Sequence, residues 1–231
     1  MLPLLISVPH AGLTIPENLR HQCALTPDEI AQDGDEGARE AYAPMEAECA
    51  HFVTSDVARA ALDLNRPEDD RSKDGVVKTN TCWDVPVWTQ PLSADQIEQL
   101  LQDHHRPYHR ELTNRAGKVK LGIDCHTMAA QAPPVAPDVG QERPAVCLSN
   151  LEGKSCPNEW LVSLAQHIEE ELGHRVSCNA PFKGGYITRA HGSEMPWMQL
   201  ELSRAPFMSW PEKGTRILRA LNRWCSGQKW V

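Results

Sequence analysis

The sequence repeatedly passes from a short apolar run into a cluster of polar residues that can carry out chemistry. Apolar runs of a length typical of a buried β-strand cover residues 4–8, 119–125, 145–149 and 198–202. Longer segments with the periodicity or capping residues of amphipathic helices cover residues 93–115, 157–172 and 211–225. Strands that alternate with helices predict an α/β fold, in which helices cover both faces of a central sheet.

The remaining segments are less regular. Thr26 and Glu29 have the spacing of a helix capping box, and the apolar positions within residues 35–52 predict another helix. Three further apolar runs are interpreted as strands, at residues 58–64, 175–178 and 186–188. Charge and proline predict long loops at residues 67–91 and 129–142. Pro107 is expected to kink or interrupt the helix that begins at Ser93.

The whole chain, residues 1–231, is expected to form a single domain. Its formal net charge of −8 argues against general binding to nucleic acid, which requires a basic surface. The apolar opening at residues 2–8 is too short to cross a bilayer and lacks the basic leader of a signal peptide. None of the eight cysteines forms a C-x-x-C pair. These features predict a cytoplasmic protein with reduced thiols and without a membrane partner.

Four polar clusters, at residues 7–12, 63–67, 123–128 and 199–202, contain residues suited to a metal-dependent hydrolase. His10 and His126 each lie at the end of an apolar run, and zinc binds imidazole together with carboxylate while leaving a position for water. Asp124 stands two residues before His126 and is expected to orient its ring. Glu201 lies within an apolar run, where a carboxylate is costly unless it is paired or coordinated. It is therefore a candidate base for a water molecule.

Each of these residues also has a purely structural interpretation. A single histidine at a strand–loop junction more often makes a structural hydrogen bond than binds a metal ion. Asp33 and Asp35 suit the start of a helix, where acidic side chains interact favourably with the helix dipole. Asn65 and Arg66 suit an ordinary turn, and Glu201 suits a buried salt bridge with an arginine. Residue types alone leave these alternatives open.

Seven motifs, in a shared order, make the chain similar to the N-formylglutamate amidohydrolase family over nearly its full length. They are V-P-H-A-G at residues 8–12, D-G-D-E-G-A-R-E-A-Y at 33–42, D-L-N-R-P at 63–67, P-Y-H at 107–109, D-C-H-T-M at 124–128, F-K-G-G-Y-I-T-R at 182–189 and Q-L-E-L at 199–202. The motif at residues 182–189 is the most specific of these, followed by those at 63–67 and 124–128.

The resemblance implies a zinc-carboxypeptidase-like fold of the phosphorylase/hydrolase kind, shared with the aspartoacylases. A mixed central β-sheet flanked by helices is therefore expected. The resemblance also implies one catalytic Zn²⁺, or another divalent metal ion, held by His10, His126 and Asp35. Asp33 and Glu36 are alternatives for the acidic ligand.

The resemblance extends to the groups that handle the substrate. As in aspartoacylases, Asn65 and Arg66 are expected to bind a substrate carboxylate, and Glu201 is expected to be the general base and proton shuttle. Arg189 is the candidate for stabilising the oxyanion and for binding substrate, with Arg66 as a second candidate for the oxyanion. Gly184 and Gly185 are expected to allow close backbone approach or a tight turn.

The expected function is hydrolysis of the amide of N-formyl-L-glutamate or a similar small anionic N-acyl amino acid, in histidine breakdown. A carboxypeptidase-like or other deacylase activity and a non-catalytic protein that binds a carboxylate or a metal ion are the alternatives. The residues from Arg66 to Trp88 differ from the family's usual loop, and such loops often set substrate choice. His109 and His191 are interpreted either as secondary groups of the pocket or as structural residues.

Overall fold

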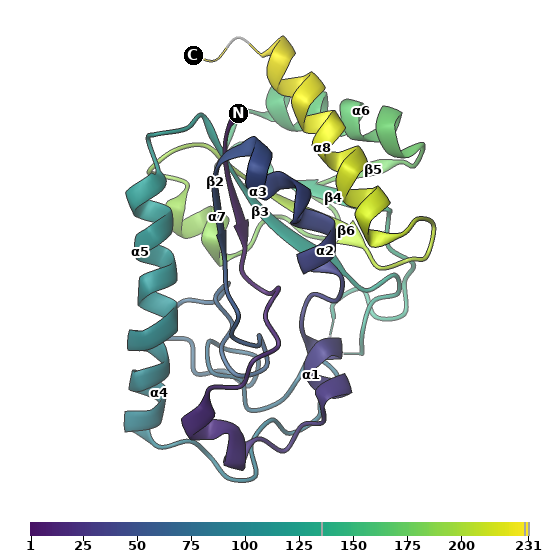
Figure 1. Ribbon diagram of the computed structural model, residues 1–231. Coiled ribbons are helices and arrows are strands. Elements are labelled where there is room, and N and C mark those ends of the chain that lie inside the picture. Colours follow the sequence, from purple (N-terminus) through teal and green to yellow (C-terminus); the bar gives the residue numbers. More distant parts are fainter. Residues whose placement is uncertain (135, 229, 231) are drawn as a thin grey trace.

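A mixed six-stranded sheet forms the centre of the computed structural model, which describes residues 1–134, 136–228 and 230 (Figure 1). The strands lie in the order β2 (Cys49–Thr54), β1 (Leu2–Val8), β3 (Leu121–Met128), β6 (Trp197–Ser203), β4 (Val146–Ser149) and β5 (Val176–Cys178). Neighbouring strands are parallel except β4 and β6, which are antiparallel. The mixed, helix-flanked sheet expected from the sequence is thereby confirmed.

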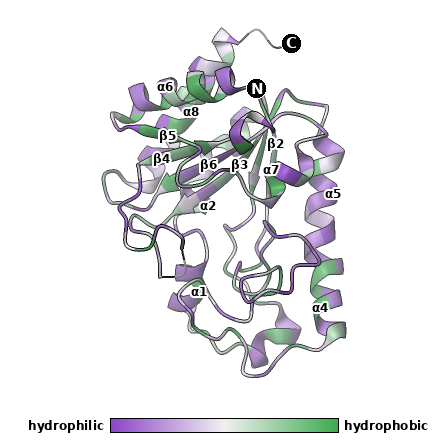
Figure 2. Cartoon of the chain, turned by 180° about the vertical axis from the view of Figure 1, so that it is seen from behind, coloured by the Kyte–Doolittle hydropathy of each residue, from purple (hydrophilic) through white to green (hydrophobic). Residues whose placement is uncertain are grey.

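Helices cover both faces of this sheet. One layer contains α2 (Ala38–Tyr42), α3 (Pro44–Glu48), α6 (Asn158–Leu172) and α8 (Trp210–Gly227). The other contains α5 (Arg106–Arg115) and α7 (Tyr186–His191), with α4 (Ala94–Leu100) joined to α5 by the π-helical turn η2 (Leu101–His105). Figure 2 shows hydrophobic and hydrophilic residues on different sides of the outer helices, as expected where one side packs on a core.

The central strands are buried along their whole length. Every residue of β3 and β6 is buried, which explains why apolar residues predominate in both strands. Gly122 of β3 makes room for its neighbour, because a Cβ atom there would lie 2.4 Å from the Trp197 ring of β6. The carboxyl ends of β1, β3 and β6 open onto a loop-rich part of the molecule, which includes η1 (Glu17–Gln22) and α1 (Pro27–Asp33) (Figure 1).

Three predicted elements differ from the structure. The helix predicted within residues 35–52 is two short helices followed by β2, whose residues pair with β1. Residues 58–64 are buried but form turns, in which Ala58 accepts hydrogen bonds from Ala61 and Leu62. Residues 186–188 begin the helix α7. In each case apolar composition indicated burial correctly but did not determine the backbone conformation.

Both predicted capping boxes are present. Thr26 caps α1 by accepting from the backbone of Glu29, and Ser93 caps α4 by accepting from Gln96. Pro107 is accommodated at the start of α5, directly after the π-helical turn, where its missing N–H is tolerated. Among the residues described, no helix combines the length and apolar character that crossing a membrane requires.

Candidate metal centre and active site

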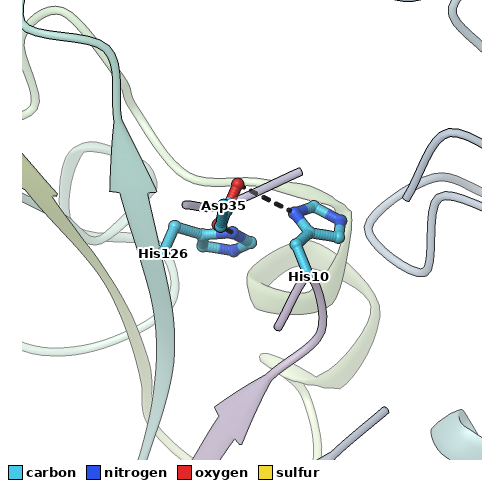
Figure 3. A group of neighbouring side chains, drawn as sticks. All are labelled: His10, Asp35 and His126. Carbon is cyan, nitrogen blue, oxygen red and sulfur yellow. Dashed lines mark hydrogen bonds and ion pairs between the residues drawn. The ribbon is translucent and has the colours of Figure 1, made fainter. Parts of the chain in front are cut away.

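The three residues expected to bind zinc lie together at the carboxyl edge of the sheet (Figure 3). His10 follows β1, His126 lies in β3, and Asp35 lies between α1 and α2. Because β1 and β3 are neighbouring parallel strands, they end at the same edge. All three side chains are buried, and one ligand atom from each lies within 4.8 Å of the others.

Each imidazole has its Nε2 atom on a carboxylate and its Nδ1 atom directed towards Asp35. Nε2 of His10 donates to Asp63 (2.8 Å), and Nε2 of His126 donates to Asp124 (2.9 Å), because an ionised carboxylate can only accept. Nδ1 of His126 is 2.9 Å from Asp35 Oδ2, and Nδ1 of His10 is 3.6 Å from Asp35 Oδ1. In the described part of the chain, Nδ1 of His10 has no hydrogen-bond partner.

This arrangement fits a divalent cation. With both Nε2 protons committed to Asp63 and Asp124, the two Nδ1 atoms converge on the Asp35 carboxylate, and a cation that replaced the proton between Nδ1 of His126 and Asp35 would find three acceptors there. A histidine ligand that passes its other N–H to a carboxylate is the usual arrangement at zinc sites. Two imidazoles and one carboxylate also match the composition of catalytic zinc centres, which leave a further position for water.

The surrounding charges favour a cation at the same place. Burial opposes ionisation of Asp35, but His10 and His126 hold its pKa well below the usual range. Burial also disfavours a charged imidazole, yet the carboxylates of Asp124 and Asp35 raise the pKa of His126 well above its ordinary value. A site whose carboxylates hold a positive charge this strongly will attract a metal ion for the same reason.

Among the acidic candidates for the third ligand, only Asp35 reaches the two histidines. Asp33 is buried against Lys78, whose Nζ lies 3.0 Å from both carboxylate oxygens, and it also accepts from the backbone of Cys82 (2.7 Å). Glu36 is exposed. The position of Asp35 is fixed further by the backbone N–H of Thr127, which donates to its Oδ2 (3.1 Å).

Glu201 lies beside this group, facing a cavity of about 330 Å³ that His10, Asp35 and His126 also line. It stands opposite His126 in the register of β3 and β6 and is only 7% exposed. Burial raises the pKa of Glu201, and the nearby Asp35 carboxylate raises it further. The amide of Gln199 donates to its Oε1 (2.6 Å). Sequence reasoning identified Glu201 but missed Gln199, which belongs to the same Q-L-E-L motif.

Asn65 is held by the protein's own groups. Its amide donates to Asp124 Oδ2 (3.3 Å), and its side-chain oxygen accepts from the backbone of Ile187 (2.8 Å). Gly185 allows this close packing, because a Cβ atom there would lie 2.3 Å from the Asn65 amide nitrogen. Asn65 therefore supports the groups around His126 and also lines the cavity, and its expected role in binding a substrate carboxylate stays a prediction.

Four arginines of the described chain line the cavity, Arg59, Arg66, Arg143 and Arg204, and of these the sequence analysis singled out Arg66. Arg66 lines it as predicted, although its guanidinium donates to the side chain and backbone of Asp74 (2.7 and 2.9 Å). Arg189 is exposed on α7 and, within the described chain, is not among the lining residues. Arg143 and Arg204 do line the cavity, and Arg204 lies 3.8 Å from Asp35. Arg204 follows the Q-L-E-L motif by two positions, and this closeness in sequence could have indicated that it lies near Glu201.

The two secondary histidines contact each other and, in the described chain, are not among the residues that line the cavity. His109 donates from Nε2 to the backbone oxygen of Leu64 (3.0 Å), and its Nδ1 lies 2.9 Å from Nε2 of His191. Their rings are stacked, with centroids 5.2 Å apart. His109 therefore contacts the segment that contains Asp63 and Asn65, and His191 contacts His109.

The fold and the site together define an α/β protein with a buried His–Asp–His cluster at the carboxyl edge of a mixed sheet. The family model for N-formylglutamate amidohydrolase matches residues 2–208. The chain belongs to this family.

Individual relatives agree with this assignment. The chain is 27% identical over 230 residues to the N-formylglutamate deformylase of Pseudomonas putida, which covers 93% of this chain and 85% of that protein. It is 26% identical over 224 residues to the enzyme of the same name from Pseudomonas aeruginosa, with coverages of 90% and 82%. The crystal structure of N-formylglutamate amidohydrolase from Ralstonia eutropha JMP134 has the same fold, with a TM-score of 0.76 at 19% identity over 97% of this chain and 91% of that one.

Proposed function

We propose that this protein is a zinc-dependent amidohydrolase that cleaves N-formyl-L-glutamate or a similar N-acyl amino acid. The observation that carries the proposal is the convergence of two Nδ1 atoms and the Asp35 carboxylate next to a buried glutamate. Membership of the family and the names of the Pseudomonas relatives support the substrate class. The eight free cysteines suit the reducing cytoplasm, where we place the reaction as a step of histidine breakdown.

His10, Asp35 and His126 would hold the metal ion. When bound, Zn²⁺ polarises the carbonyl of the amide and lowers the pKa of a coordinated water molecule to about 7. Asp63 and Asp124 fix the tautomer of each histidine by accepting its Nε2 proton, and so leave each Nδ1 free to bind.

Glu201 is the proposed proton carrier. Its carboxylate accepts a proton as water attacks the carbonyl carbon, and it donates that proton to the nitrogen of the leaving amine. The raised pKa of Glu201, caused first by burial, increases its affinity for the proton that it must carry. Gln199 holds one carboxylate oxygen in place through its hydrogen bond.

Arginines of the cavity suit the two negative charges that the reaction involves. Arg66 remains the proposed group for a substrate carboxylate, which would compete with Asp74 for its guanidinium. Arg204 is better placed than Arg189 to support the oxyanion, because it lines the cavity and lies near Asp35.

Release of formate and glutamate from N-formyl-L-glutamate tests the proposal. Zinc-loaded wild type and Glu201→Gln are compared, with zinc content measured for both. Release by the wild type, with kcat for the variant reduced on the order of 10²- to 10⁴-fold at equal zinc content, is expected. If neither protein releases formate while both bind zinc, N-formylglutamate is the wrong substrate. A panel of other N-acyl amino acids and short peptides then separates deacylase from carboxypeptidase activity and from binding alone.

A further inference from the structure

The short segment from Asp63 to Arg66 supports both imidazoles of the proposed metal site. Asp63 accepts the Nε2 proton of His10 (2.8 Å). Asn65 donates to Asp124, which in turn accepts the Nε2 proton of His126. A displacement of this backbone would therefore move the partners of two proposed ligands together. Whatever holds the segment in place also controls the geometry of the site.

Two histidines on one face of a neighbouring helix hold this segment. His105 lies within 2.8 Å of the backbone oxygen of Arg66, and His109 lies within 3.0 Å of that of Leu64, in both cases through Nε2. A carbonyl oxygen only accepts, so both Nε2 atoms must carry protons. The two contacts lie on either side of Asn65, and the two rings pack with centroids 4.4 Å apart. His105 is the last residue of the π-helical turn η2, and such turns are frequent at functional sites.

A chain of contacts on the other side of His109 fixes its ring. Nδ1 of His109 faces Nε2 of His191 at 2.9 Å, and Nδ1 of His191 faces a carboxylate oxygen of Glu194 at 2.9 Å. That carboxylate also accepts from the hydroxyl of Thr113 (2.8 Å). The chain therefore connects the surface of the molecule to the backbone of Leu64.

The partners along this chain indicate which nitrogen atoms donate and which accept. Leu64 requires a proton on Nε2 of His109, and ionised Glu194 requires one on Nδ1 of His191. The contact between the rings requires a third proton, because two lone pairs would repel each other. Burial, followed by the charges of His105 and His191, lowers the pKa of His109 to about 3. His109 therefore accepts through its Nδ1 atom, and Nε2 of His191 donates to it.

We propose that His109, fixed by His191 and Glu194, acts together with His105 as a positioning residue that holds residues 63–66 and thereby the imidazoles of His10 and His126. The inference rests on the proposed function, because it assigns these residues to the same metal site. The groups that face His109 are His105, Tyr108, Tyr186 and His191. The carboxylate at the end of this chain is that of Glu194.

Zinc affinity and steady-state kinetics of three variants test the proposal. His109→Ala removes both hydrogen bonds, whereas the amide of His109→Gln can donate to Leu64 and accept from His191. His104→Ala, in the π-helical turn η2 that precedes α5, is the matched control. We expect His109→Ala to weaken zinc binding by about tenfold or more and to lower kcat while KM stays within about twofold. His109→Gln should restore most of both, and His104→Ala should match the wild type.

Two results would overturn the proposal: His109→Ala that matches His104→Ala in zinc affinity and kcat, or a folded His109→Gln that is as impaired as His109→Ala. If His109→Ala does not fold, Glu194→Gln replaces it, because this side chain is 28% exposed and should weaken zinc binding in the same direction. Zinc affinity is measured without substrate. A wild type that binds zinc but hydrolyses no amide therefore refutes the proposed function while this test still gives an answer, and a wild type that binds no zinc refutes both.

Discussion

At the residue scale, each histidine of the proposed zinc site has two distinct nitrogen atoms with separate tasks. Nε2 is held by Asp63 in one case and by Asp124 in the other, and Nδ1 points into the site. The hydrogen bond to a carboxylate fixes the ring and increases the electron density on the opposite nitrogen. These supporting acids should therefore affect metal affinity almost as strongly as the ligands do.

Replacement of Asp124 tests this dependence. Asp124→Asn keeps the size of the side chain but removes its charge, so His126 becomes a weaker ligand. Zinc affinity, measured by competition with a chromophoric chelator, should fall on the order of 10- to 100-fold. Asp95→Asn, at an exposed position in the first turn of α4, is the control for a loss of one charge. Equal affinities for the two variants would contradict the role given to Asp124.

His109 gives a prediction about pH and stability. Its pKa is lowered to about 3 in the folded protein, whereas in the unfolded chain it takes the ordinary value of 6.5. Between these values the unfolded state binds the extra proton, so stability falls as the pH is lowered from 6.5 towards 3. Urea unfolding of His109→Gln should show a weaker pH dependence over this range than the wild type. Identical slopes would show that His109 does not contribute.

The site was predictable from the sequence to an uneven degree. His10 follows an apolar strand, and His126 and Glu201 lie within two others. The sequence alone therefore predicts that the three residues gather at one edge of the sheet. Arg143 was not predicted because its place depends on how a loop folds back over that edge, whereas Arg204 directly follows β6 and was within reach of prediction. Arg189 lies on α7, where a helix takes the place of the expected strand and carries its side chain to the surface, and its expected role in binding substrate stays a prediction.

At the element scale, the sequence signals that worked were those with a local physical cause. Side-chain capping of Thr26 and Ser93 depends on residues three positions apart, and both caps are present as predicted. β2 was missed because its conformation depends on pairing with β1, which is distant in sequence. The turns at residues 58–64 were missed because an apolar run is buried equally well in several backbone conformations.

The cap of α1 offers a test at this scale. Thr26→Ala removes the acceptor for the Glu29 backbone, and should lower the free energy of unfolding by about 1 kcal/mol. Thr215→Ala, at an exposed threonine within α8, serves as the comparison for a lost hydroxyl group. Chemical denaturation of both variants measures the difference. A smaller loss for Thr26→Ala than for Thr215→Ala would contradict the importance of the cap.

At the scale of the whole molecule, the proposed centre joins segments that are far apart in the sequence. His10, Asp35 and His126 come from three regions, and all three side chains are buried. A metal ion that binds this folded arrangement, but not the unfolded chain, must stabilise the fold. The gain should be about 2.7 kcal/mol when free zinc is 100 times its dissociation constant.

Thermal unfolding measures this linkage. Removing zinc with a chelator should lower the Tm of the wild type, and adding zinc back should restore it. His126→Ala should have nearly the same Tm with and without zinc, because it lacks one of the three ligands. A zinc-dependent rise in Tm of equal size in both proteins would place the ion elsewhere.

Anomalous X-ray scattering at the zinc edge, from crystals of the zinc-loaded protein, locates the metal ion directly. One strong peak per chain is expected between Nδ1 of His10, Nδ1 of His126 and the carboxylate of Asp35, with Glu201 beside it. A peak bound by other residues, or none at this position while the protein contains stoichiometric zinc, would show that these three residues are not the zinc ligands.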